Sequence, residues 1–214
     1  DINGIVTLPL VGQDTDVYAI DSEQSISRMK SLSTSDVNPR IELPVLPSDG
    51  SDWIIESGVN IVLDDFSGEL LSNISIKDGG SLNLIGSSLT ALNVSIESGG
   101  ILTGTDSNFI GEEFSISSSE IGDESSSLFL EGLIEVNCEL VNMNWYGITL
   151  NGDVNLITSS NCELSLFGGG LIGSTTISQG GSIVQFTNLL VSVVDQGEPI
   201  SSAFISLDGI QENN

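Results

Sequence analysis

The sequence predicts an all-β fold, a right-handed parallel β-helix of about seven coils with roughly 20 residues in each. Two observations lead to this prediction. The segment from Asn73 to Leu82 recurs with few changes one coil later, from Asn93 to Leu102. Apolar residues in each repeat alternate with Ser, Asn, Thr and Glu, which is the period of a strand with one buried face.

One apolar position marks every coil and sets the register of the repeat. Its members follow one another at a nearly constant interval of one coil: Ile55, Ile76, Ile96, Ile116, Val136, Leu156 and Ile177. Stacked coils pair each strand with its counterpart above and below, so we expect these side chains to form one inward-facing ladder.

Each coil is expected to hold three short strands separated by turns, as in Ile74–Ile76, Leu82–Leu84 and Leu89–Ala91. Glycine pairs mark the turns, because glycine adopts positive φ at little cost. The pairs are Gly79-Gly80, Gly99-Gly100 and Gly180-Gly181. A leucine-rich repeat is disfavoured, because its L-x-x-L-x-L-x-x-N pattern does not recur, and a β-sandwich would give strands without a fixed register.

The stretch IVLDDFSGELLSNISIKDGGSLNLIGSSLT, which follows Trp53 and a Ser-Gly turn, resembles right-handed β-helix repeat proteins of archaeal and bacterial cell surfaces. The resemblance covers about residues 53–190. It implies the solenoid fold and an extracellular or cell-surface location. The resemblance does not identify a function, because proteins with this fold include lyases, adhesins and passive stalks.

The N-terminal segment, residues 1–50, lacks the repeat. Pro39, Pro44 and Pro47 favour an extended linker before Asp52, and the helical spacing of Ile26 and Met29 predicts a short helix within residues 21–33. A solenoid needs its open ends covered, so residues 1–50 are interpreted either as a cap or as an arm that docks on a neighbouring molecule.

The C-terminal segment, residues 191–214, changes character. It resembles the opening hairpin of carboxypeptidase-regulatory-like domains, which are small Ig-like sandwiches. The matching positions are Val193, Asp195, Gly197, Pro199, Ala203, Ile205 and Leu207. A hairpin is not stable alone, so the segment either begins a domain of a longer protein or packs on a partner or on the β-helix.

Charge narrows the set of partners. The chain has 30 acidic and 4 basic residues, no His and a net charge of −26, yet its mean hydropathy is +0.22. It therefore folds, and its acidic surface disfavours nucleic acid and anionic membranes. No apolar run long enough to span a membrane exists, so we expect no membrane insertion. An acidic shell suits a saline exterior, where salt screens self-repulsion.

The composition argues against catalysis. Without His, the Ser-His-Asp, Cys-His and His-metal sites are absent. Lys77 is the single basic residue of the coils and Asp64-Asp65 their single adjacent Asp pair, which is little for a lyase or a glycosidase. We expect no enzyme activity and no cofactor, apart from loosely bound calcium. The calcium candidates are Asp14, Asp16, Asp21 and Glu23.

Two residue pairs are candidates for covalent modification, one for a disulfide and one for glycosylation. Cys138 and Cys162 each stand in Asn-Cys-Glu-Leu, one coil and a slightly longer turn apart, and on adjacent coils they form either a disulfide or two buried free thiols. Asn73 and Asn93 begin Asn-x-Ser glycosylation sequons one coil apart. A stacked Asn ladder at a turn explains that second pair equally well.

These observations favour an extracellular structural or adhesive surface protein that assembles with itself, into a filament or layer, or with a neighbouring surface protein. Arg28, Lys30 and Arg40 form a small basic segment that could meet the acidic wall of another copy. The alternative is a carbohydrate-binding or polysaccharide-degrading β-helix. The Trp145-Tyr146 pair is either its sugar platform or, as a simpler interpretation, packed at a turn.

Overall fold

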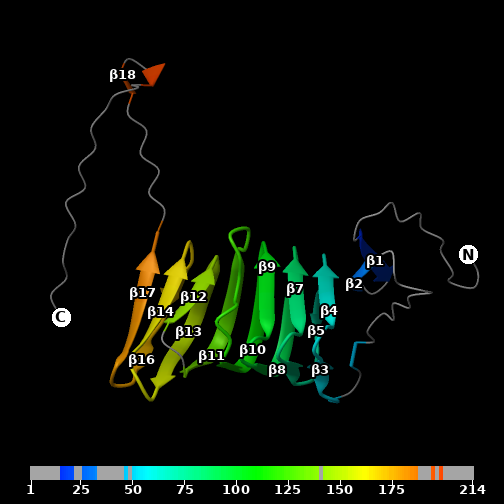
Figure 1. The fold of residues 1–214 in the computed structure, drawn as a ribbon, viewed down its shortest axis with the longest axis horizontal. Coiled ribbons are helices and arrows are strands. Elements are labelled where there is room, and N and C mark those ends of the chain that lie inside the picture. Colours follow the sequence, from blue (N-terminus) through cyan, green and yellow to red (C-terminus); the bar gives the residue numbers. More distant parts are fainter. Residues whose placement is uncertain are drawn as a thin grey trace, which may run out of the picture.

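A computed structural model describes residues 46–47, 50–139 and 142–187, together with the backbone of four strands at 15–21, 26–32, 194–195 and 198–199. These residues contain strands and no helix. Between residues 53 and 186 the strands stack in parallel as a β-solenoid of about seven turns, as predicted (Figure 1). In the part of the chain that is described, no helix of a length and apolarity suited to crossing a membrane is found.

The long wall of the solenoid is a nine-stranded sheet. Its strands are β3 (Trp53–Ile55), β5 (Ser67–Glu69), β6 (Ile74–Ile76), β8 (Ser88–Ile96), β10 (Ser107–Ile116), β11 (Leu128–Cys138), β13 (Ile148–Thr158), β15 (Gly170–Ile172) and β16 (Thr175–Ile177). In β8, β10, β11 and β13, the third strand expected in a coil runs without a turn into the first strand of the next coil. The sequence pattern had suggested two separate short strands there.

The short wall is built from two sheets. One contains β4 (Asn60–Asp64), β7 (Ser81–Ile85) and β9 (Ile101–Thr105), and the other contains β12 (Asn142–Tyr146), β14 (Cys162–Phe167) and β17 (Gly181–Phe186). The fourth coil has only a loop at 117–127 where this wall should continue. Ile121 bridges the gap, because it pairs with Leu102 and its carbonyl accepts the Tyr146 N–H at 3.2 Å.

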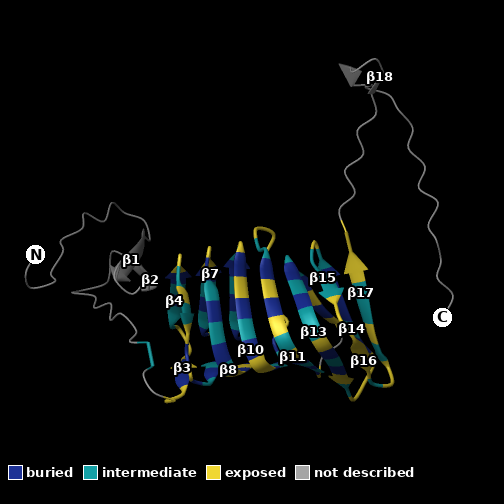
Figure 2. Cartoon of the chain, turned by 180° about the vertical axis from the view of Figure 1, so that it is seen from behind, coloured by how far each residue is buried: buried dark blue, intermediate teal, exposed yellow. Residues whose placement is uncertain are grey.

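The predicted ladder is confirmed in register and in orientation. Each of its seven members is the pairing partner of the next, from Ile55 with Ile76 to Leu156 with Ile177. The first six are fully buried, whereas Ile177 in the last coil is exposed. Figure 2 shows the same pattern along the solenoid, with buried positions alternating with exposed ones in the middle coils and little burial in the last strands.

Glycines make the turns between the walls. Gly79, Gly99 and Gly180 all have positive φ, and the N–H of the residue after each donates back to the carbonyl three residues earlier, as from Gly80 to Lys77 at 2.8 Å. The turns also stack, because the Gly79 N–H donates to the Gly99 carbonyl of the next coil at 2.9 Å.

The N-terminal segment corrects one expectation. The predicted helix within residues 21–33 is wrong: β2 (Ile26–Leu32) is a strand, paired antiparallel with β1 (Thr15–Asp21) on one side and with β4 on the other. The edge of β4 offers N–H and C=O groups to the segment, whereas a helix this short is marginal. At the other end, β18 (Val194–Asp195) and β19 (Glu198–Pro199) pair antiparallel, and the rest of the C-terminal segment lies outside the described residues.

Candidate functional site

The basic residue of the coils is engaged in an ion pair. The Lys77 ammonium lies 2.5 Å from a Glu97 carboxylate oxygen at the same turn of the next coil. This hydrogen bond raises the pKa of Lys77 above its usual value of 10.5 and lowers the pKa of Glu97 below 4.5. Lys77 is therefore held as a charged partner of Glu97, which is the opposite of what a general base requires.

The adjacent Asp pair lies at the corner after β4. Asp65 has a φ of 52°, and its N–H donates to the Ile85 carbonyl at 2.9 Å. Gly86 and Asp106 take the same left-handed conformation at the matching corners of the next two coils. Asp tolerates this conformation better than most residues. The geometry thus explains Asp65 as a corner residue of the repeat.

The two sequon asparagines form a stacked ladder. Asn93 Nδ2 donates to Asn73 Oδ1 at 3.0 Å, and Asn73 Nδ2 donates to Asp52 Oδ1 at 2.8 Å. Three consecutive coils are linked in this way along the middle of the long wall, between its two strand segments. The glycosylation of Asn73 and Asn93 stays a prediction, while the ladder interpretation is confirmed.

The cysteines are joined. Cys138, at the end of β11, and Cys162, at the start of β14, form a disulfide with a Cα–Cα distance of 6.3 Å. Both residues are buried. In strand register Cys138 faces Thr158, so the bridge does not run straight down one ladder. It spans the corner and fixes the long wall of one coil to the short wall of the next.

The two residues of the aromatic pair in β12 have different environments, since Trp145 lies in the core and Tyr146 on the outside. Trp145 is fully buried, and its Nε1–H donates to the Ser118 carbonyl at 3.1 Å, so it is not available as a sugar platform. Tyr146 instead begins an outer stack that continues through Phe167 and Phe186, with ring centroids 4.9 and 4.6 Å apart. This aromatic ladder was missed from the sequence, although its three members recur at the interval of the coils.

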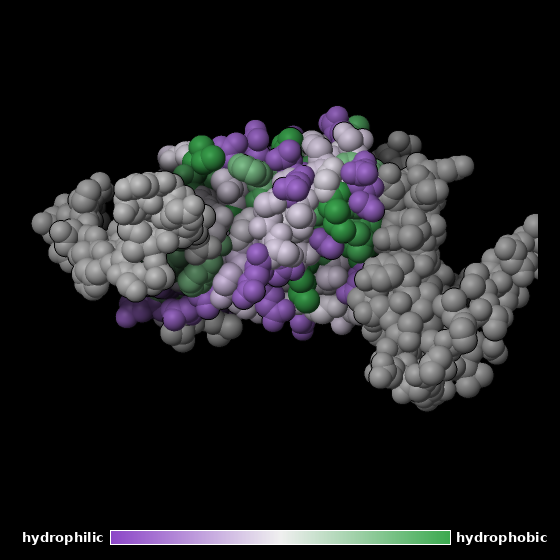
Figure 3. All heavy atoms as spheres, turned by 90° about the horizontal axis from the view of Figure 1, so that it is seen from above, coloured by the Kyte–Doolittle hydropathy of each residue, from purple (hydrophilic) through white to green (hydrophobic). Residues whose placement is uncertain are grey.

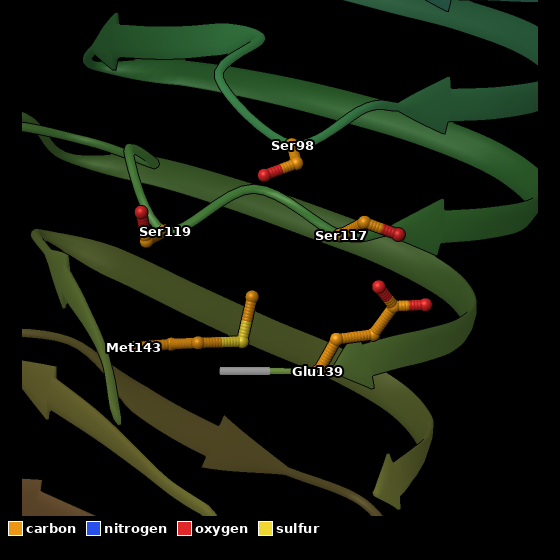
Figure 4. A pocket seen from close by; sticks show the side chains of 5 residues that line it. All are labelled: Ser98, Ser117, Ser119, Glu139 and Met143. Atoms are coloured by element: carbon orange, nitrogen blue, oxygen red, sulfur yellow. The ribbon is translucent and has the colours of Figure 1, made fainter. Parts of the chain in front are cut away.

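The largest departure from the repeat leaves a hollow. Where the loop at 117–127 replaces a strand, a cavity of about 240 Å³ is lined by Ser98, Ser117, Ser119, Glu139 and Met143. Figure 4 shows Ser98, Ser119 and Met143 around this space, with Glu139 and Ser117 together at one end. Its hydroxyl and carboxylate groups are suited to hydrogen bonding with water or with a small polyhydroxylated molecule.

A second, shallower hollow lies on the long wall. It measures about 360 Å³ and its floor includes Gly132 and Gly152, with Glu131, Leu133, Asn151 and Asp153 along its sides. The two glycines have φ of 147° and 138°, and a Cβ at Gly152 would collide with the Gly132 carbonyl oxygen. Successive glycines thus let the backbones approach closely at this point of the sheet.

The remaining predicted site residues are not brought together by the described structure. Asp16 and Asp21 belong to β1, and Asp14 and Glu23 lie outside the described residues. The described part of the chain contains no cluster of three metal-ligating side chains. Arg28 and Lys30 lie on β2, and Arg40 is outside the described part.

Comparison with known proteins gives no match. No family model, no curated protein and no solved structure matches this chain. Within the coils, the ion pair, the Asn ladder and the aromatic ladder all join one coil to the next. Such an arrangement stiffens a rod.

Proposed function

We propose that this chain is a structural or adhesive element of an extracellular surface, acting as a rigid rod that assembles with copies of itself or with a neighbouring surface protein. One observation supports this above the others. A single ladder runs from Ile55 to Ile177 without a break in register, so the long wall is continuous over about seven turns. A stacked solenoid of this kind transmits position and load along its axis.

The covalent and electrostatic features agree with an exterior location. Disulfides persist in oxidising compartments, and the Cys138–Cys162 bridge fastens two coils beside the loop at 117–127, where the short wall is weakest. The net charge of −26 repels other copies at low ionic strength. Salt and divalent cations would screen this repulsion, so the protein is suited to saline surroundings.

The backbone pairing of β2 limits how the basic N-terminal segment could take part in assembly. The basic residues Arg28 and Lys30 lie on β2, and the backbone of β2 is paired with β4 of its own chain. This pairing favours the cap over the docking arm among the two interpretations of residues 1–50. An interaction between this basic segment and the acidic wall of another copy would have to proceed without releasing that strand.

Assembly is the decisive test. Light scattering and electron microscopy of the full chain in high salt, with and without calcium, should show filaments, layers or defined oligomers. Deleting residues 1–50 should increase non-specific association, because the edge of β4 is then uncovered. A protein that stays monomeric in every condition, with or without residues 1–50, would exclude self-assembly.

Carbohydrate binding is the second candidate, and the cavity beside Glu139 is the observation that favours it. Its serine hydroxyls and carboxylate match sugar hydroxyls, and Met143 offers an apolar surface for ring C–H groups. A glycan array should then show a ligand whose binding is abolished by Glu139→Ala, with Glu69→Ala, at an exposed position of the first coil, as the control. We expect no depolymerisation of acidic or neutral polysaccharides. Turnover that is lost in Lys77→Ala or Asp65→Ala would overturn this expectation.

A further inference from the structure

The two ends of the solenoid are unlike each other. Ile55 in the first coil is as fully buried as the ladder residues in the middle. At the same register in the last coil, Ile177 is 42% exposed. Leu171 on β15 and Ile183 on β17, which pair with the fully buried Leu150 and Leu164, are only partly buried. The C-terminal end of the core is thus an apolar surface.

This end also differs in charge from the rest of the rod. Every one of the first six coils carries carboxylates, from Asp52 in the first to Asp153 and Glu163 in the sixth. Between Glu163 and Asp195 there is no charged residue at all, and this stretch contains the whole seventh coil. Figure 3 shows one face of the rod, where hydrophobic side chains are scattered among strongly hydrophilic ones.

An uncharged, apolar end fits one partner best, a second copy of this chain. Two rods of net charge −26 repel each other wherever carboxylates face carboxylates, and the seventh coil is the surface where this repulsion is smallest. A nucleic acid or another strongly charged partner would find no complementary charge there. The inward-facing apolar side chains of the last coil, Leu171, Ile177 and Ile183, supply the attraction.

Strand geometry favours the same partner. In the described residues, β15, β16 and β17 each have a pairing partner on one side only, namely β13 or β14. Such edges bind other strands. A copy related by a two-fold axis presents the same strands running in the opposite direction, so that edges meet as antiparallel pairs. The first coil is a poorer partner, because β2 already occupies the edge of β4.

We propose that two copies associate end to end through the seventh coil, with β15, β16 and β17 of each facing those of the other. The contact is isologous and closed, so it yields dimers of doubled length, and any filament or layer requires a second contact elsewhere. This inference rests on the proposed function and deepens it, since it assigns the surface through which the rods meet.

Sedimentation velocity and light scattering of the full chain test the proposal, across a range of protein concentrations in buffer with enough salt to screen the acidic walls. Wild-type protein should have twice the monomer mass. Leu171→Glu and Ile177→Glu should each halve that mass and weaken association by on the order of tenfold or more, because each places a carboxylate in an apolar contact. Phe129→Glu is the matched control, since Phe129 is 44% exposed on the wall of a middle coil, and it should remain dimeric.

Three results would contradict the proposal, and they bear differently on the proposed function. A wild-type dimer that survives both glutamate variants, or is lost equally in Phe129→Glu, places the contact elsewhere and leaves the self-assembling rod intact. A monomeric wild type that still forms layers with calcium refutes the end-to-end dimer alone. Dimers that form only after residues 188–214 are deleted would show that the chain's own tail occupies this surface. Circular dichroism of each variant confirms that the solenoid is folded.

Discussion

Replacing Ile96 with Ala tests the buried ladder directly. Ile96 is fully buried and lies between Ile76 and Ile116 in consecutive coils. The change removes three carbon atoms, which at about 0.8 kcal/mol for each buried methylene gives roughly 2.4 kcal/mol of lost transfer free energy. The coils above and below hold the cavity open, so we expect a total loss of about 2–5 kcal/mol in the free energy of unfolding.

Ile177→Ala is the internal control, because it makes the same chemical change at the same register in the last coil. Ile177 has no coil beyond it among the described residues and is already 42% exposed, so the expected loss is about 1 kcal/mol. Urea unfolding followed by circular dichroism, at concentrations where the chain is monomeric, measures both. Equal losses in the two variants, or a loss below about 0.5 kcal/mol for Ile96→Ala, would refute the dry, continuous core.

Three further predictions follow from local geometry. Gly152→Ala should lower the free energy of unfolding by about 3 kcal/mol or more, because the added Cβ meets a carbonyl of the neighbouring coil. Gly58→Ala, at positive φ in open space, should lower it by only about 1 kcal/mol. Equal urea midpoints for the two variants would contradict this difference. Reducing the disulfide, whose cysteines are separated by 24 positions, should lower the unfolding free energy by about 3 kcal/mol, and an unchanged urea midpoint would contradict its stabilising role. Lys77→Met should destabilise the protein at neutral pH, and this difference from the wild type should disappear in acid. The reason is that the pKa of Glu97 is lower in the folded protein, so the ion pair contributes fully above pH 4.5 and its contribution is lost as the pH falls through the pKa of Glu97 in the folded state. A difference that persists in strong acid would show that Lys77 acts through packing alone.

The sequence by itself determined the fold class and the register of the coils. A nearly constant interval between the apolar positions leaves a solenoid one way to stack, so that Ile76 must face Ile96 and Ile96 must face Ile116. The Gly79 and Gly99 turns were equally readable, because positive φ is a local requirement that glycine meets. Local rules repeated at a fixed interval make such a fold predictable.

Other features were decided only by the tertiary structure. The segment with Ile26 and Met29 has helical spacing, yet it forms a strand, because the free edge of β4 is a partner that no local pattern reveals. The sequence left Trp145 either as a sugar platform or as a residue packed at a turn, and its burial depends on the loop at 117–127, which supplies the Ser118 carbonyl.

The disulfide and the open end show the same limit. The spacing of the cysteines does not match the repeat, and only the corner between the walls brings Cys138 to Cys162. The charge-free stretch after Glu163 is visible in the sequence. Whether it forms an exposed apolar surface depends on which coil lies at the end of the stack. Burial at an end is a property of what lies beyond the last coil, and a repeat pattern contains no information about where its own stacking is interrupted.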